Sequence, residues 1–369
     1  MPNTILIRGA GAVSPAGWGV EALLNALGGQ APGLSSITTT SREPRHPPLM
    51  HAAIPAPVTR PAWLAHPRLR RAGGVSHYVV SAALEALGLD SVPQGDPAMQ
   101  RLGIILCVMT GNVTYSRRFY DEVLRQPSTA SPVIFPETVF NAPASHLAAL
   151  LGADGINYTL VGDASAFVEG LTIAASWITT GLVDRALVVG AEEPDWLTAE
   201  AWELFGSPAL ASGGAGAVLL AKDTQAGHVP LPIELSQISE IFSHHNLSSR
   251  ARAIAAARAD VAHPAPIHPD RALLVDGCVG ARRYDTAETD VWLDWKGPRL
   301  SPKRALGEGF AAGSAWQCVT AVEALRRGCA DEAWVSVPGL NLGAACVRIR
   351  KPDPVDTSPH STKPPIPGF

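Results

Sequence analysis

The amino-acid sequence predicts an α/β fold built around a largely parallel, covered sheet. Short apolar runs such as residues 102–109 (LGIILCVM) and 184–190 (DRALVVG) have the length and composition of buried strands. Patterns with helical periodicity, such as residues 76–87 (SHYVVSAALEAL), alternate with these runs. Because strands that alternate with helices of about a dozen residues are typical of βαβ units, we expect parallel strands with helices on both faces.

The first half of the chain is expected to contain most of the regular elements. A buried strand and a Gly-rich turn are predicted at residues 5–19, and the Pro-, Ser- and Thr-rich stretch at 31–67 predicts an irregular surface excursion. The remaining predictions are helices at 20–27, 76–87, 142–151 and 169–180 and strands at 102–109, 184–190 and 213–221.

The second half repeats this alternation more loosely, which suggests an internal duplication. The predictions are strands at 231–241, 271–275, 333–337 and 344–349 and helices at 249–261 and 313–325. We therefore expect one half at 1–225, a second half at 226–350, and a mobile tail at 351–369, where Pro and Ser occur without apolar spacing.

Bulk composition excludes several classes of function. The net charge of −4 argues against a nucleic-acid surface. The five cysteines show no CxxC spacing, which argues against a disulfide framework or a zinc site. No signal peptide and no stretch of apolar residues long enough to span a membrane is found, so a cytoplasmic protein is expected.

Residues 161–170 (VGDASAFVEG) are the segment in which a catalytic nucleophile would be expected. They lie between an apolar run and a helical pattern, where several α/β enzymes hold a nucleophile on a tight strand-to-helix turn. Alanine occupies position 164 of this turn, and Ser165 follows it. Either the site has lost its nucleophile, or Ser165 has taken over that role.

Five sequence blocks resemble the ketosynthases of the thiolase-fold superfamily, the condensing enzymes of fatty acid and polyketide synthesis. They are GAGAVSPAGWGVEALLNAL at 9–27, SPVIFPETVFNAPASHLAALLG at 131–152, GDASAFVEGLTIAASWITTGLVDRALVVGAEE at 162–193, SGGAGAVLLAK at 212–222 and SPKRALGEGFAAG at 301–313. The resemblance implies a duplicated thiolase-like fold with α-β-α-β-α layers and two mixed, mainly parallel sheets.

The resemblance also implies where the catalytic residues of such an enzyme would stand. An acylated cysteine corresponds to Ala164, and two histidines that stabilise the developing negative charge correspond to Asp276 and Glu308. The accompanying lysine and acidic residue are retained as Lys303 and Glu288. Alanine cannot be acylated, and ionised carboxylates donate no hydrogen bond to an enolate, so the family's whole catalytic set is missing.

Ser165 is the candidate nucleophile of an alternative hypothesis, an acyltransferase or hydrolase on the same fold. Its surroundings do not match GxSxG, and Asp163, Asp276 and Glu308 are weak bases for a hydroxyl. The structural alternative is that the Ser165 hydroxyl caps the following helix by accepting a backbone N–H.

Lys303 and Glu288 are expected to form a buried ion pair that shapes the former pocket, although Lys303 could instead neutralise Asp276 or Glu308. A metal held by Asp163, Asp276 and Glu308 has no support from ligand spacing. No metal and no cofactor are therefore expected.

Silent members of this family, called chain-length factors, pair with an active ketosynthase and help to set the length of its product. The resemblance implies that Phe135, Phe140, Asn141 and Phe167 border the acyl tunnel or the subunit interface, and that the strand near residues 155–162 pairs across it. The expected partners are an active ketosynthase and, through the complex, an acyl carrier protein, in fatty acid, polyketide or aryl-polyene-type synthesis. A stand-alone module that binds acyl chains is a further alternative.

Overall fold

The computed structural model describes residues 4–27, 34–37, 49–93, 95–193, 195–204, 209–222, 231–262, 269–340 and 343–352. The α-helices in these ranges are α1 (Val20–Ala26), α2 (Gly74–Leu87), α3 (Val113–Arg125), α4 (Ala142–Leu151), α5 (Ser165–Thr180), α6 (Trp196–Leu204), α7 (Leu247–Asp260), α8 (Arg282–Val291), α9 (Pro302–Leu306) and α10 (Phe310–Arg326). None of these helices is long and apolar enough to cross a membrane.

The strands in the same ranges are β1 (Ile5–Ser14), β2 (Gly17–Trp18), β3 (Leu34–Ile37), β4 (Leu49–Ala52), β5 (Leu102–Val108), β6 (Asn157–Val161), β7 (Arg185–Glu192), β8 (Gly214–Lys222), β9 (Ile233–Ile238), β10 (Phe242–Ser243), β11 (Ala272–Val275), β12 (Arg299–Leu300), β13 (Glu332–Pro338) and β14 (Gly343–Arg350). Short 3-10 helices occur at Ala62–Ala65, Pro67–Leu69, Pro97–Met99, Pro127–Thr129, Phe135–Glu137 and Pro269–Arg271.

The strand order shows an internal duplication. The main sheet runs β12-β11-β13-β14-β9-β1-β8-β7-β5-β6, so each half has the same order when read from its outer strand to the centre. The directions repeat as well: β5 and β11 pair in parallel with both of their neighbours, whereas β8 and β14 are antiparallel to both of theirs. The predicted duplicated α/β fold is therefore confirmed.

Two details of the predicted sheet are wrong. The halves are joined into one hydrogen-bonded path, because β1 and β9 pair at Leu6↔Glu234 and Ile7↔Ile233. Antiparallel pairings also predominate over parallel ones in the described residues. Apolar runs show burial but not direction, and the short connection from β13 to β14 permits only an antiparallel return.

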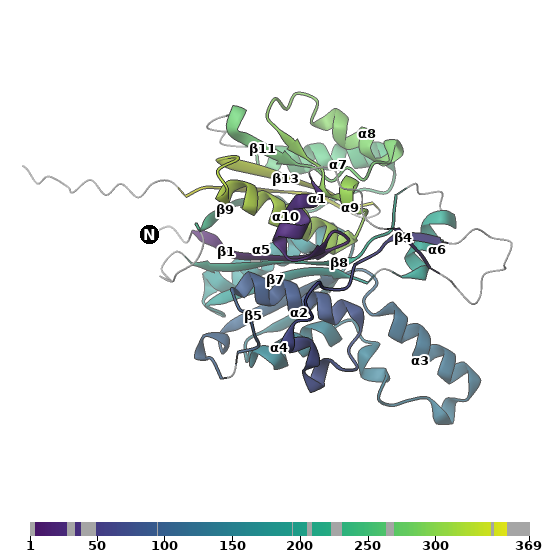
Figure 1. Ribbon diagram of the computed structural model, residues 1–369. Helices are drawn as coiled ribbons and strands as arrows, with labels where there is room; N and C mark the ends of the chain where they lie inside the picture. Colours follow the sequence, from purple (N-terminus) through teal and green to yellow (C-terminus); the bar gives the residue numbers. More distant parts are fainter. Residues whose placement is uncertain are drawn as a thin grey trace, which may run out of the picture.

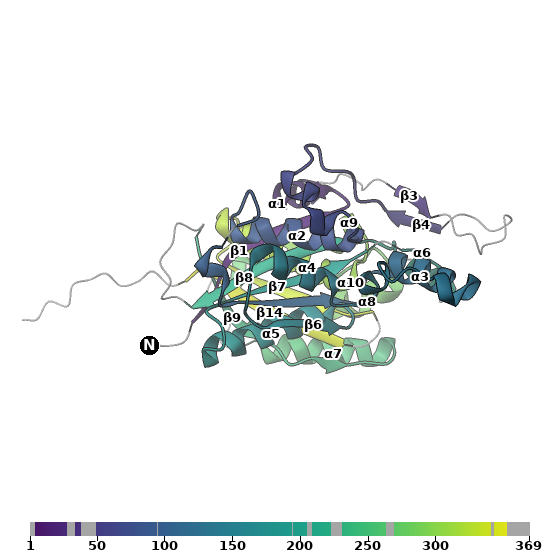
Figure 2. The same ribbon diagram turned by 90° about the horizontal axis from the view of Figure 1, so that it is seen from below.

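The layers follow the predicted α-β-α-β-α order (Figures 1 and 2). One outer layer contains α2 and α4, the central layer contains α5 and α10, and the other outer layer contains α7 and α8. Glycines allow the helices to lie close to the strands: a Cβ on Gly9 of β1 would lie 1.7 Å from the Ala86 carbonyl oxygen of α2, and one on Gly190 of β7 would lie 2.1 Å from that of Ala311 in α10. The apolar faces of α5 and α10 thus fill the largest core cluster.

Several sequence-based boundaries differ from the structure or lie outside the described residues. The stretch at 31–67 is not wholly irregular, because β3 and β4 pair in an antiparallel ribbon there. Helices α3 and α6 were not predicted, because α3 is mostly polar and α6 is short. The half boundary near residue 225 and nearly all of the tail at 351–369 lie outside the described residues.

Candidate functional site

The strand-to-helix turn after β6 holds a buried alanine, Ala164, at the position that the sequence analysis assigned to a nucleophile. Ala164 is the N-cap residue of α5, and its side chain belongs to the main core cluster. The Ala164 carbonyl oxygen accepts a hydrogen bond from the Ser314 hydroxyl of α10 at 2.7 Å. The turn is thus anchored to the other helix of the central layer, and the side chain at position 164 is a buried methyl group.

Ser165 forms its hydrogen bonds with the nearby side chain of Asp163. Its hydroxyl donates to Asp163 Oδ1 at 2.9 Å, and its backbone N–H donates to the same oxygen at 3.2 Å. The prediction that the Ser165 hydroxyl accepts a helix N–H is therefore wrong, because the Asp163 carboxylate is the acceptor at this turn. A carboxylate is a weak base for a serine hydroxyl, so this contact supplies little activation.

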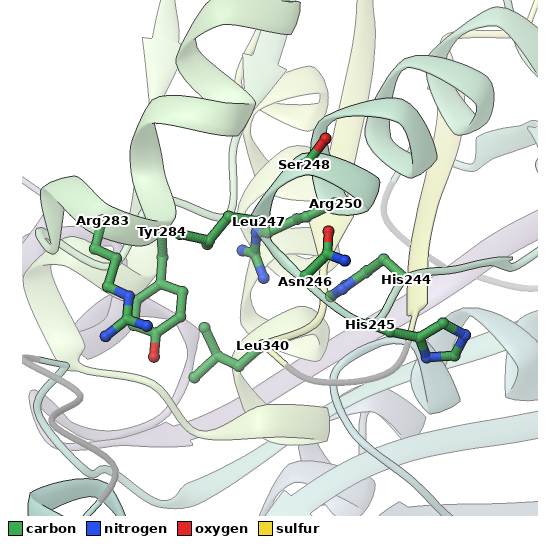
Figure 3. Close-up of a pocket in the computed structure, with 9 residues that line it drawn as sticks. All are labelled: His244, His245, Asn246, Leu247, Ser248, Arg250, Arg283, Tyr284 and Leu340. Carbon is green, nitrogen blue, oxygen red and sulfur yellow. The ribbon is translucent and has the colours of Figure 1, made fainter.

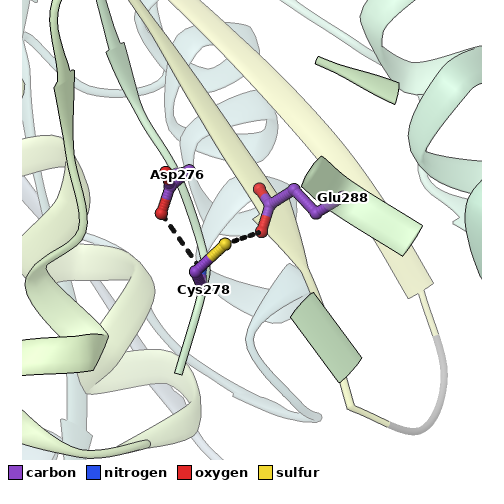
Figure 4. A group of neighbouring side chains, drawn as sticks. All are labelled: Asp276, Cys278 and Glu288. Atoms are coloured by element: carbon purple, nitrogen blue, oxygen red, sulfur yellow. Dashed lines mark hydrogen bonds between the residues drawn. The ribbon is translucent and has the colours of Figure 1, made fainter. Parts of the chain in front are cut away.

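Asp276, which the sequence analysis assigned to the first histidine position, lies directly after β11 in a buried acidic cluster (Figure 4). Asp276 Oδ1 accepts the backbone N–H of Cys278 at 3.1 Å. Glu288 of α8 accepts the Gly277 N–H with its two oxygens at 3.0 and 3.1 Å, and the Cys278 thiol lies 3.6 Å from Glu288 Oε2. Burial and the charge of Asp276 raise the pKa of Glu288 to about 7, against the opposing effects of the Gly277 N–H, Ser336 and Arg250.

This cluster fits a hydrogen-bonded core better than a metal site. The possible ligand atoms of Asp276, Cys278 and Glu288 lie within 4.8 Å of one another. Both Glu288 oxygens already accept a backbone N–H, however, and burial and the nearby carboxylates raise the pKa of the Cys278 thiol, which disfavours a thiolate ligand.

Glu308, which the sequence analysis assigned to the second histidine position, belongs to a fully buried ion pair. Lys303 Nζ lies 3.0 Å from Glu308 Oε2, and the two side chains are 0% and 1% exposed. The second Glu308 oxygen accepts the Phe310 N–H at 2.7 Å, at the start of α10. The expected Lys303–Glu288 pair is therefore wrong: Lys303 neutralises Glu308, while Glu288 is held by the backbone of Gly277.

Arg250 of α7, which the sequence analysis did not single out, interacts with the Asp163 turn, with Glu288 and with Glu308. Its buried guanidinium donates from Nη1 to the Gly339 carbonyl oxygen and from Nη2 to that of Pro338 at 3.4 Å. Burial lowers the pKa of Arg250, and the carboxylates of Glu288, Glu308, Asp163 and Asp285 oppose that shift. One cation thus interacts electrostatically with carboxylates of the turn before α5, of α8 and of the segment before α10.

A cavity of about 600 Å³ opens on the outer side of Arg250 (Figure 3). Its lining comes from the approach to α7, the start of α8 and the end of β13: His244, His245, Asn246, Leu247, Ser248, Arg250, Arg283, Tyr284 and Leu340. We call it the α7 cavity. His244 Nε2 bonds the Gly339 carbonyl oxygen at 3.1 Å, and burial together with the charge of Arg250 lowers its pKa. The sequence analysis placed the start of this helix at residue 249, whereas α7 begins at Leu247, after Asn246, which forms a capping box with Ser249.

The residues expected at the acyl tunnel or interface are found in two environments. Phe135, Phe140 and Asn141 are exposed, and the Phe135 ring lies 5.4 Å from that of Phe119 on α3. Phe167 of α5 is fully buried in the main core cluster. The first three are thus available to a partner, whereas Phe167 packs inside this chain.

Strand β6 is the outermost strand of its half of the sheet and pairs only with β5 among the described residues. Apolar side chains stand exposed along it and just before it, at Ile156, Tyr158 and Val161. A second exposed apolar set lies on α3 and in the segment that follows it: Tyr120, Leu124, Val133, Phe135, Val139 and Phe140. Unpaired backbone groups beside exposed apolar side chains are typical of a strand edge that another chain covers.

Comparisons with known proteins agree with the fold. The family model of 3-oxoacyl-[acyl-carrier-protein (ACP)] synthase III matches residues 160–237, from β6 through β8 into β9. No curated protein matches the chain by sequence.

Solved structures match over nearly the whole chain. The ishigamide ketosynthase/chain length factor gives a TM-score of 0.76 at 18% identity, covering 94% of this chain and 99% of that one. A beta-ketoacyl synthase from Burkholderia phymatum gives 0.75 at 16%, covering 95% and 100%. The complex of a ketosynthase (ApeO) with its chain length factor (ApeC) from Xenorhabdus doucetiae gives 0.74 at 16%, covering 95% and 99%. The chain therefore has the fold of ketosynthase structures.

Proposed function

We propose that this chain is a catalytically silent, ketosynthase-like subunit that pairs with an active β-ketoacyl-ACP synthase and helps to shape its acyl tunnel. The observation that carries the proposal is the buried methyl group of Ala164 at the nucleophile turn of an otherwise intact fold. An acyl chain cannot be transferred to alanine, so any condensation needs a nucleophile from another chain.

The two histidine positions support the same proposal. Glu308 forms an ion pair with Lys303 and accepts the Phe310 N–H. Asp276 accepts a backbone N–H of its own loop. Neither carboxylate is arranged to donate a hydrogen bond to a developing oxyanion or enolate. The site has thus been rebuilt as packed, charge-compensated core, which supports a structural role better than a different chemistry.

The β6 edge supports pairing with another chain. Tyr158 and Val161 are 50% and 56% exposed on a strand with one unpaired side. A partner strand would satisfy the free backbone groups and cover both side chains. The exposed Phe135 and Phe140 would then lie at or near the contact and limit how far the partner's acyl chain extends.

Co-expression with ketosynthases of the same genome, followed by mass measurement of the purified complex, tests the proposal. We expect a one-to-one heterodimer that elongates acyl-ACP with malonyl-ACP only when both chains are present. Tyr158→Lys should abolish the complex, whereas Leu293→Lys, at a 74% exposed site after α8, should leave it intact. Condensation by this chain alone, or a homodimer that binds none of the co-expressed ketosynthases, would overturn the proposal.

The alternative enzyme with Ser165 as nucleophile is tested on the same samples. Its one described hydroxyl partner is the Asp163 carboxylate, which favours a structural role. Labelling of Ser165 by a fluorophosphonate probe, with loss of turnover in Ser165→Ala, would establish that alternative and replace the proposal.

A further inference from the structure

The α7 cavity ends before it reaches the nucleophile turn. Its lining includes Arg250 and Leu340, but neither Asp163, Ala164 nor Ser165 belongs to it. All three residues of the turn are buried. Something between Arg250 and Asp163 therefore separates the cavity from the turn.

The separating element is the backbone at Gly339. On one side, a Cβ placed on Gly339 would lie 2.0 Å from Asp163 Oδ2, so its Cα packs directly against that carboxylate. On the other side, the Gly339 carbonyl oxygen accepts hydrogen bonds from Arg250 Nη1 and His244 Nε2. The peptide is thus held between the turn and two buried side chains of the cavity floor.

Charge strengthens this arrangement. The Arg250 guanidinium interacts electrostatically with the carboxylates of Asp163, Glu288 and Glu308, and these carboxylates oppose the lowering of its pKa by burial. Buried carboxylates are costly unless a cation or hydrogen bonds compensate them. Moving Arg250 outward would remove that compensation as well as the two carbonyl contacts.

We propose that Arg250, with His244 and Gly339, forms a wall that keeps any molecule in the α7 cavity from reaching the Ala164–Ser165 turn. The chain would therefore stay silent even with a nucleophile restored at position 164. The inference rests on the described contacts and does not depend on the partner proposed above.

Thiol accessibility tests the wall. In a Cys329→Ser background, which removes the one exposed cysteine of the described residues, Ala164→Cys and Ser248→Cys are compared for alkylation by iodoacetamide, with mass mapping of the product. Ser248 lines the cavity and is exposed. We expect the site in Ala164→Cys to react at least about a hundredfold more slowly, because a walled-off thiol reacts only during local opening. Equal rates would overturn the proposal.

A second alkylation experiment weakens the wall by replacing Arg250. Arg250→Ala combined with Ala164→Cys should raise the alkylation rate at position 164 by at least about tenfold, since the backbone at Gly339 then loses the guanidinium contacts that hold it against the turn and opens more often. Arg283→Ala, which removes an exposed arginine from the same cavity, is the matched control and should not change the rate. Unchanged protection in a folded Arg250→Ala variant would refute the role of Arg250. If that variant does not fold, His244→Ala combined with Ala164→Cys provides the same test, because it removes the other side-chain contact to the Gly339 carbonyl oxygen.

Discussion

The Lys303–Glu308 pair offers the sharpest test of the rebuilt site. Both side chains are fully buried, and the charged atoms lie 3.0 Å apart. Lys303→Met leaves the Glu308 carboxylate without its cation, which is expected to cost about 3–5 kcal/mol of unfolding free energy. Glu308→Gln keeps an acceptor for the Phe310 N–H but leaves the ammonium of Lys303 uncompensated, so a similar loss is expected.

The double variant separates charge from packing. Combining Lys303→Met with Glu308→Gln removes both charges together, so its loss should be smaller than the sum of the single losses by at least about 2 kcal/mol. Urea unfolding with an unchanged m-value is the measurement. Arg101→Met is the control, because its pair with Asp184 at 2.8 Å is 55% and 48% exposed and should be worth at most about 1 kcal/mol. If Lys303→Met costs no more than Arg101→Met, or the single losses simply add, the reasoning is refuted.

Three further results are expected. Burial raises the pKa of Glu192 to about 8, so between its ordinary value of 4.5 and that pH the folded chain holds a proton that the unfolded chain releases. Unfolding free energy should therefore fall across this window by a few kcal/mol, and urea titrations of Glu192→Gln should show a flatter slope. Gly190→Ala should lower the thermal midpoint clearly more than Gly74→Ala. The Cβ added at Gly190 would lie 2.1 Å from the Ala311 carbonyl oxygen, whereas the one added at Gly74 would lie 3.3 Å from the Tyr78 hydroxyl. Ala164→Cys should not restore condensation in an assay with acyl-ACP and malonyl-ACP, since carboxylates occupy both histidine positions; product formation would contradict this.

The buried carboxylates share one physical feature. Asp276 accepts a backbone N–H of its own loop, whereas Glu308 pairs with Lys303, and the charge of Glu308 also interacts with Arg250. Such compensated buried charges stabilise one packing of the loops.

The sequence by itself determined which segments are buried and in what order they occur. Helix α4 was predicted with the observed bounds, and the strands at β5, β11 and β14 were placed within a residue or two, because periodicity and apolar runs are local properties. The strand-to-helix turn at Ala164 was also predicted, since the change from an apolar run to a helical pattern is visible in the chain alone.

Only the tertiary structure decided which distant groups meet. Lys303 pairs with Glu308 and not with Glu288, the two halves join through β1 and β9, and Arg250 reaches Gly339 across 89 positions of sequence. Local patterns encode burial but not partner choice. Which charge, strand or carbonyl a buried group finds depends on how the layers pack around it, because an unpaired buried group costs too much to remain so.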